Sequence, residues 1–259
     1  MNIQQYYRKS ASISLNASLV SLIPSFFLLI YGLILKQDER MVLLCLPFLI
    51  YSFICYQIYL INDKRVGGSV KAQESDCDFS NLLKHNQVLI TFLPAPSLRM
   101  LIFNTKGQML GEIRDMNWQR IRWFVPYMID RILFERSYGL FDESGQLKAK
   151  IIIQKNNIAL AGNRSTQQIK LLRRTHAEYD FSHEGRRICV KRSMLFTDIK
   201  LSIGGLGYAR VRKGLLPKEC VGQIQDPNTP VLSFEEGVKA KDKLMIYAIL
   251  AKLFHHSNH

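Results

Sequence analysis

Two long stretches without a charged residue stand near the start of the chain. They cover residues 13–35 and 41–61, which are 23 and 21 residues long. A helix needs about 20 apolar residues to cross the hydrocarbon core of a bilayer, and soluble helices of this length normally carry a charged face. The pattern therefore predicts a two-span transmembrane hairpin over residues 1–62, with its turn at residues 36–40, four of which are charged.

Basic residues on either side of these stretches predict the orientation of the hairpin. Arg8 and Lys9 precede the first stretch, and Lys64, Arg65 and Lys71 follow the second. Because Lys and Arg collect on the cytoplasmic side of membrane proteins, both ends of the hairpin are expected to be cytosolic. The rest of the chain then lies in the cytosol, and we expect a location at a membrane, with the plasma membrane as the first candidate.

The pattern changes after a polar linker with Gly and Ser residues at positions 63–80. Short apolar runs now alternate with turn residues, which is typical of antiparallel β structure. A Phe-x3-Gly pattern occurs three times in this part of the chain. It begins at Phe103, Phe141 and Phe181, each of which is followed four residues later by a glycine. Glycine supplies the positive φ that a reversing turn commonly needs, so each copy predicts a β-hairpin.

Further apolar and β-branched runs predict strands at residues 151–154, 188–190, 198–203, 207–211, 220–225 and 231–234. The total is about ten to twelve strands, a number that indicates a barrel or a sandwich. One short helix is expected within residues 115–132. We expect all of these elements to belong to one domain at residues 81–259.

The last predicted element is a helix over residues 243–254, with Asp242 as its cap. Its central part, residues 244–251, is apolar on every side. A helix of this kind is normally buried, and this one is too short to span a bilayer. The predicted fold class is therefore an N-terminal α-helical transmembrane hairpin plus a mainly-β domain, in which a closed antiparallel barrel of about twelve strands surrounds a buried C-terminal helix.

The repeated Phe-x3-Gly hairpins at Phe103, Phe141 and Phe181, the number of strands and the apolar terminal helix together resemble the tubby C-terminal-like superfamily. Tubby domains, plant LURP-one-related proteins and phospholipid scramblases belong to it. The resemblance covers residues 86–256 and implies a twelve-stranded barrel around a hydrophobic helix, in a non-enzymatic domain that binds lipid headgroups at a membrane surface. The chain departs from scramblases because its spans are N-terminal. It also has no segment equivalent to their calcium-binding region or to the tubby phosphoinositide pocket.

The net charge of +14 is concentrated in one part of the predicted β domain. Residues 1–62 contribute a net charge of +2, whereas residues 144–213 contain 15 Lys and Arg and only four Asp and Glu. If the apolar residues 188, 190, 209 and 211 face inward, the basic residues beside them share the outer face. The candidate residues for binding an anion or a lipid are Arg173, Arg174, Arg187, Lys191, Arg192, Arg210, Arg212 and Lys213. The alternative is a solvated basic face without a ligand.

No catalytic motif is found in the sequence. It contains no Gly-x-Ser-x-Gly, no His-Glu-x-x-His and no Gly-rich phosphate loop before a helix. We therefore expect a non-enzymatic protein without a cofactor or a metal. His255, His256 and His259 are interpreted as a solvated chain end, and Cys189 is interpreted as a structural thiol.

Three functional hypotheses follow from these observations. The first is a membrane-anchored module whose basic barrel binds anionic lipid headgroups or a phosphorylated ligand at the membrane surface. The second is a protein-interaction or regulatory factor, for example an immunity or assembly factor, for another membrane protein. The third, lipid scrambling or transport, rests on the resemblance alone. Nucleic acid is not an expected partner, because no helix-turn-helix, zinc site or RNA-binding motif accompanies the charge.

Overall fold

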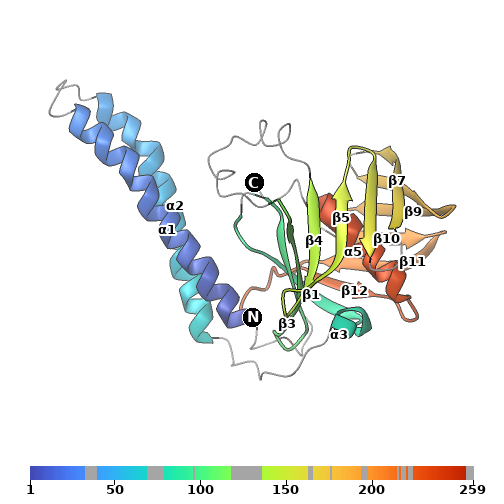
Figure 1. Ribbon diagram of the computed structural model, residues 1–259. Helices are drawn as coiled ribbons and strands as arrows, with labels where there is room; N and C mark the ends of the chain where they lie inside the picture. The colour runs from blue at the N-terminus through green and yellow to red at the C-terminus, as the bar shows by residue number, and fades with distance from the viewer. Residues whose placement is uncertain are drawn as a thin grey trace. The chain divides into compact units, whose positions relative to one another are not determined.

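The computed structural model describes residues 1–32, 40–68, 79–95, 97–117, 136–162, 166–175, 177–193, 198–214, 216, 220 and 224–254 (Figure 1). The chain divides into two compact units. One unit comprises Ile3–Lys71, and the other comprises Met1–Asn2 together with Ala72–His259.

The smaller unit is a pair of helices, α1 (Ile3–Ile30) and α2 (Arg40–Gly68). They pack antiparallel, because Ser18 Oγ lies 3.0 Å from Ser52 Oγ and the Cys45 thiol donates to the carbonyl of Ser25 at 3.5 Å. The buried face of α1 carries five serines, Ser10, Ser14, Ser18, Ser21 and Ser25. The large apolar side chains of α1 point away from α2 and are exposed, among them Leu19, Val20, Ile23, Phe26 and Phe27.

Small polar residues inside and large apolar residues outside are the reverse of a soluble helix pair and are typical of helices packed in a bilayer. Both helices are long and apolar enough to cross a membrane. The 28 residues of α1 extend over about 42 Å, compared with about 30 Å for the hydrocarbon core of a bilayer. Helix α2 continues to Gly68, past the expected end of the hairpin at residue 62, and its last turns include Asp63, Lys64 and Arg65.

The larger unit is a closed antiparallel barrel of twelve strands, as the sequence pattern predicts. Each strand pairs with its neighbours in sequence, and β1 pairs with β12 to complete the ring. The strands are β1 (Gln87–Phe92), β2 (Arg99–Phe103), β3 (Met109–Asp115), β4 (Ser137–Asp142), β5 (Leu147–Ile153), β6 (Asn157–Gly162), β7 (Thr166–Arg174), β8 (Glu178–His183), β9 (Arg186–Arg192), β10 (Ile199–Ile203), β11 (Leu206–Arg212) and β12 (Val231–Phe234). Helices α3 (Phe79–Lys84) and α5 (Ala240–Phe254) complete the unit.

The three predicted hairpins are confirmed as β2–β3, β4–β5 and β8–β9. Their turn glycines all have positive φ, 74° at Gly107, 79° at Gly145 and 75° at Gly185. The first two turns also share their side-chain chemistry. Asn104 Oδ1 accepts the backbone N–H of Gln108 at 2.9 Å, and Asp142 Oδ1 accepts that of Gln146 at 2.8 Å. The two turns are therefore stabilised in the same way, by a short polar side chain that mimics a backbone acceptor.

Residues 220–225 were expected to form a strand, and this expectation is wrong for the residues that the structure describes there. Cys220 and Ile224 are buried, but neither belongs to the sheet. The reason is that β11 pairs directly with β12, so the ring has no place for another strand between them. Of the helix expected within residues 115–132, only residues 115–117 are described, and Asp115 ends β3.

Helix α5 forms the centre of the hydrophobic core. Every residue from Met245 to Ala251 is buried, and these side chains form one cluster with the inward-facing residues of the strands. Tyr247 is completely buried, and its ring meets Phe234 of β12 edge-on, with the ring centroids 5.8 Å apart. The barrel wall therefore surrounds a helix whose central part has no polar face, as the sequence predicts.

Polar contacts hold the first turn of α5 against the strands. Lys243 Nζ donates to the His85 carbonyl and to Asn86 Oδ1, both at 3.0 Å, and burial lowers the pKa of this lysine. Asp242 accepts a hydrogen bond from Arg186 Nη2 at 3.0 Å. The helix begins at Ala240, so Asp242 lies within its first turn and binds Arg186 of β9. The expected role of Asp242 as the cap is therefore wrong.

A glycine substitution tests the hairpin turns. Gly185 has a φ of 75° and open space around an added Cβ, so Gly185→Ala should cost about 1 kcal/mol of unfolding free energy through backbone strain alone. Gly207→Ala is the matched control, because that position also has open space but no positive φ. Its effect should stay within about 0.5 kcal/mol. Chemical denaturation of the detergent-solubilised protein measures both, and equal losses would contradict the role of the turn.

Candidate anion-binding surface

The predicted alternation of inward and outward residues is confirmed on β9 and β11. Ile188 and Val190 of β9 are buried in the core, while Arg187 and Lys191 are exposed on the outer face. On β11, the buried residues at 209 and 211 alternate in the same way with Arg210 and Arg212. Because a strand presents successive side chains to opposite faces, the apolar interior forces these basic residues outward.

Three basic residues stand directly opposite one another on adjacent strands. Lys191 of β9 pairs in register with Lys200 of β10, and Lys200 pairs with Arg210 of β11. Neighbouring strands lie about 4.8 Å apart, so this row places three positive charges along about 10 Å of surface. Like charges in directly opposite positions destabilise a sheet. The cationic row therefore favours the approach of an anion.

Lys200 was not among the candidate residues from the sequence. It is exposed, and its neighbours Ile199 and Leu201 are buried. The same alternation that identified Arg187 and Lys191 applies to β10 and was sufficient to find Lys200.

Acidic residues neutralise part of this surface. Three ion pairs cross it, Arg187–Asp180 at 2.8 Å, Lys191–Glu178 at 3.2 Å and Arg210–Asp198 at 3.0 Å. The hydrogen bond and charge of Arg187 hold the pKa of Asp180 below its usual range. Arg187 and Lys191 are largely exposed, so water and salt screen their pairs and each is worth little on its own.

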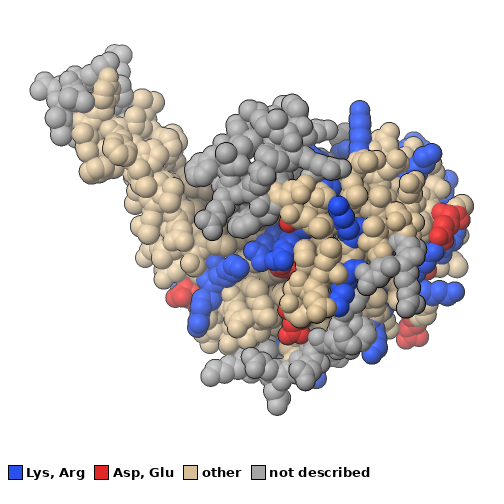
Figure 2. Space-filling model, viewed as in Figure 1, with Lys and Arg blue, Asp and Glu red and all other residues tan. Residues whose placement is uncertain are grey.

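Other basic residues of the surface remain available to a ligand. Within the described part of the chain, Lys200, Arg173 and Arg212 form no ion pair. Arg173 stands opposite Asp180 in the register of β7 and β8. Lys213 is exposed directly after β11. Figure 2 shows that Lys and Arg residues outnumber Asp and Glu on the visible face.

Two of the candidate arginines do not belong to this outer surface. The guanidinium of Arg174 lies 5.6 Å from the ring centroid of Tyr179, at the end of the barrel. Arg192 lines a small cavity of about 30 Å³ beside Tyr179, Leu253 and Phe254. Arg174 and Arg192 are the last residues of β7 and β9. By strand register and alternation they point to the same side as the inward-facing residues, so they lie at the end of the barrel around α5.

Lys252, near the end of α5, belongs to the same end of the barrel. Its Nζ donates to the carbonyls of Gln154 and Lys155 at 3.0 Å and 3.1 Å. Burial, together with the positive charge of Arg174, lowers the pKa of Lys252 to about 8. This end of the barrel therefore holds a basic group that titrates close to physiological pH.

Cys189 lies on the outer face between Arg187 and Lys191. Burial and the neighbouring Asp180 raise the pKa of its thiol, despite the basic residues beside it in the sequence. The thiol is therefore mostly protonated at neutral pH, which disfavours a reactive role. Among the described residues, no group of His, Cys, Asp and Glu is arranged to hold a metal, and the C-terminal histidines 255, 256 and 259 lie outside the described residues.

Comparisons with known proteins give a limited result. No family model matches the chain, and no curated protein matches its sequence. A similar solved structure is the X-ray structure of a protein from Arabidopsis thaliana, which is 14% identical and superposes with a TM-score of 0.42. The match covers 64% of this chain and 90% of that chain. At this identity and TM-score, the likeness does not extend to function.

The titration of Lys252 tests the electrostatics at the end of the barrel. Because its folded pKa lies near 8, below that of a free lysine, the protein should gain stability as the pH rises from about 8 to about 10.5. Arg174→Gln removes a positive neighbour and should raise the midpoint, but only in part, since burial is the larger cause. NMR of 13C-labelled lysine follows the titration. Lys200→Gln is the control and should leave the midpoint unchanged, and an unchanged midpoint in Arg174→Gln would contradict the coupling.

Proposed function

We propose that this protein is a membrane-anchored, non-enzymatic module whose basic barrel surface binds anionic lipid headgroups at the cytosolic face of a membrane, the plasma membrane being the first candidate. The observation that carries the proposal is the in-register row of Lys191, Lys200 and Arg210 on the outer wall of the barrel. The alternative is that the surface binds a phosphorylated ligand, whose phosphate has the same anionic chemistry as a lipid headgroup.

The form of this surface favours many weak contacts with a charged plane. The row crosses the outer wall of three adjacent strands. Arg187 and Arg212 extend the basic surface along β9 and β11, and Arg173 adds a charge on β7. Each Lys or Arg near an anionic leaflet contributes about 1 kcal/mol. The exposed ion pairs can exchange their carboxylates for lipid phosphates at little cost, since such pairs are weak in water.

In this proposal the helix pair anchors the barrel. Met1–Asn2 belong to the barrel unit, where Asn2 forms a β-bridge with Gln108, and the chain after Gly68 returns to that unit. A hairpin of two spans has both of its ends on one side of the bilayer, so both would lie on the side of the barrel. The anchor keeps the basic surface at a high effective concentration near the lipid, which allows weak contacts to suffice.

We also infer that the barrel belongs to the tubby C-terminal-like superfamily. The support is the closed ring of twelve strands, the buried helix α5 and the hairpins that follow Phe103, Phe141 and Phe181. Lipid scrambling gains no such support. A scrambling pathway needs polar groups facing the lipid or a water-filled cavity, whereas Ser18 and Ser52 bind each other between the helices.

Substituted-cysteine labelling tests the proposed topology. In a cysteine-free variant of the full chain, Gln37→Cys lies between the two uncharged stretches of the sequence and Gly67→Cys lies near the end of α2. A membrane-impermeant maleimide should label Gln37→Cys on intact cells and Gly67→Cys only after permeabilisation. The reverse pattern would place the barrel outside the cytosol.

Vesicle cosedimentation tests the basic surface. Residues 72–259, which are the barrel unit without Met1–Asn2, contain every strand and the whole core cluster, so they are the part to use. Lys200→Gln combined with Arg212→Gln removes two charges that form no ion pair with the described residues. This double change should weaken binding to phosphatidylserine vesicles by about 2 kcal/mol, or roughly thirtyfold.

The matched control for this experiment removes the same net charge elsewhere. Lys106→Gln with Lys239→Gln changes two exposed lysines outside strands β7–β11 and should have a much smaller effect. Binding that ignores both salt and anionic lipid content would exclude the lipid proposal and favour a protein partner.

A further inference from the structure

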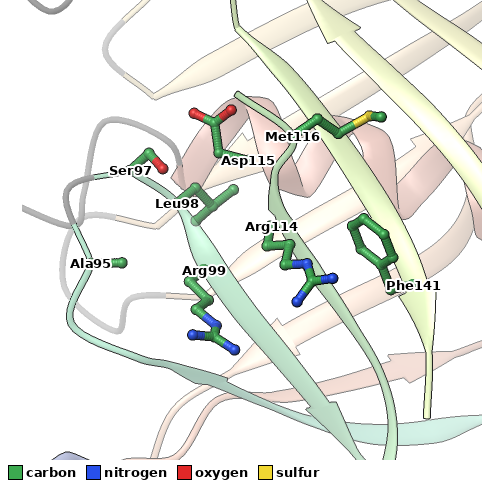
Figure 3. Close-up of a pocket in the computed structure, with 8 residues that line it drawn as sticks. All are labelled: Ala95, Ser97, Leu98, Arg99, Arg114, Asp115, Met116 and Phe141. Atoms are coloured by element: carbon green, nitrogen blue, oxygen red, sulfur yellow. The ribbon is translucent and has the colours of Figure 1, made fainter. Parts of the chain in front are cut away.

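A pocket of about 310 Å³ lies on the outer wall of the barrel at strands β2, β3 and β4 (Figure 3). Its size is at the lower end of the range for small-molecule sites. The lining residues are Ala95, Ser97, Leu98, Arg99, Arg114, Asp115, Met116 and Phe141. They combine two guanidinium groups with apolar walls, and none of them belongs to the basic surface of β7–β11.

The two arginines share one carboxylate. Arg99 and Arg114 stand opposite each other in the register of β2 and β3. Arg99 Nη2 lies 3.2 Å from Glu112 Oε2, and Arg114 Nη1 lies 2.8 Å from Glu112 Oε1. The single carboxylate of Glu112 therefore balances only one of the two positive charges. Figure 3 shows both guanidinium groups side by side.

The arginine pair has hydrogen-bonding capacity to spare. Arg99 Nε is buried and has no hydrogen-bond acceptor within the described part of the chain. A buried donor without an acceptor is costly, so an oxygen from a ligand would stabilise it. Asp115 does not fill this role, because Figure 3 shows its carboxylate at a distance from both guanidinium groups. Asp115 Oδ1 instead accepts the backbone N–H of Asn117 at 2.8 Å.

An aromatic ring forms the other side of the pocket. The Arg114 guanidinium lies 4.1 Å from the ring centroid of Phe141, a distance typical of a cation–π contact. Gly139 makes room for this ring, since a Cβ at that position would lie only 2.5 Å from Phe141 Cε2. Leu98 and Met116 add further apolar surface. The pocket therefore has a cationic end, formed by the two guanidinium groups, and apolar walls.

The position of the pocket in the ring sets it apart from the basic surface. Strands β3 and β9 lie six positions apart in either direction around the twelve-stranded ring. The two features therefore lie on opposite walls of the barrel. A membrane bound at β9–β11 would leave the pocket facing away from the lipid, where a soluble molecule can reach it.

We propose that this pocket binds a small soluble organic anion, with one carboxylate or phosphate group on an aromatic or similarly apolar body. The two guanidinium groups hold the anionic oxygens, for which their forked geometry is suited. Phe141, Leu98 and Met116 contact the apolar body. The inference goes beyond lipid binding and does not depend on it, because it uses different residues on the opposite wall.

Calorimetric titration of the full-length protein in non-ionic detergent tests this site. The probes are phenyl phosphate and benzoate, with benzamide as the neutral counterpart of benzoate. At least one anion should bind saturably, and benzamide should bind at least about tenfold more weakly. Arg99→Gln should weaken the bound anion by about tenfold or more. Arg99→Lys keeps the positive charge but loses the forked guanidinium group. Its affinity for the anion should lie between those of the wild type and Arg99→Gln.

A second variant protects the test against misfolding. Met116 is 39% exposed at the edge of the pocket, so Met116→Trp should fill the space without disturbing the arginines. The substitution should weaken binding of the same anion at least about tenfold, while the thermal unfolding transition is retained. Lys200→Gln, on the opposite wall, is the matched control and should bind as the wild type does.

Several results would overturn the proposal. One is the absence of saturable binding of either anion up to about 10 mM. Another is an affinity that Arg99→Gln and Met116→Trp both leave unchanged. Equal affinity for benzoate and benzamide would also overturn it. If Arg99→Gln abolished binding of the barrel unit to phosphatidylserine vesicles while neither soluble anion bound the wild type, the pocket would belong to a lipid.

Discussion

The closure of twelve strands around helix α5 is the constraint on which the other features of the barrel depend. The pairing of β1 with β12 leaves no strand edge open, so every strand has a neighbour on both sides. Such a ring needs an apolar filling, and α5 provides it because its residues from Met245 to Ala251 are buried on every side. Lys243 and Lys252 hold its two ends through hydrogen bonds to residues before β1 and between β5 and β6. The helix and the wall therefore stabilise each other, and neither has an alternative way to cover its apolar surface.

The apolar interior also decides where charge can go. A strand residue that faces α5 has no access to water, so charged strand residues are placed on the outer face or at the ends of the barrel. The high charge of residues 144–213 is therefore carried by the outer faces and the ends of strands β5–β11. The register turns part of it into the row of Lys191, Lys200 and Arg210. The opposite wall uses arginine differently. There Arg99 and Arg114 share Glu112 beside the ring of Phe141, so the two walls arrange their basic groups differently.

The helix pair follows the reverse rule of packing. Serines such as Ser18 form the contact with α2, and the large apolar side chains remain exposed. In water this arrangement would be unstable, since exposed apolar surface is unfavourable and buried hydroxyls gain little. In a bilayer the lipid tails cover the apolar side chains, and small residues let the two helices approach closely. The two units of the chain thus follow opposite rules of packing, and the helix pair is long and apolar enough to cross a membrane.

The sequence alone determined the features that depend on a short continuous stretch of residues. The uncharged runs predict the two helices, the glycines after Phe103, Phe141 and Phe181 predict the hairpins, and an all-round apolar segment predicts the buried α5. Tertiary structure decided which residues meet. The sequence did not predict the place of Lys200 in the row, the position of Arg174 and Arg192 at the barrel end, or the sharing of Glu112 by Arg99 and Arg114. These depend on strand register, bulges and ring closure, because residues far apart in sequence become neighbours only when the whole sheet has closed.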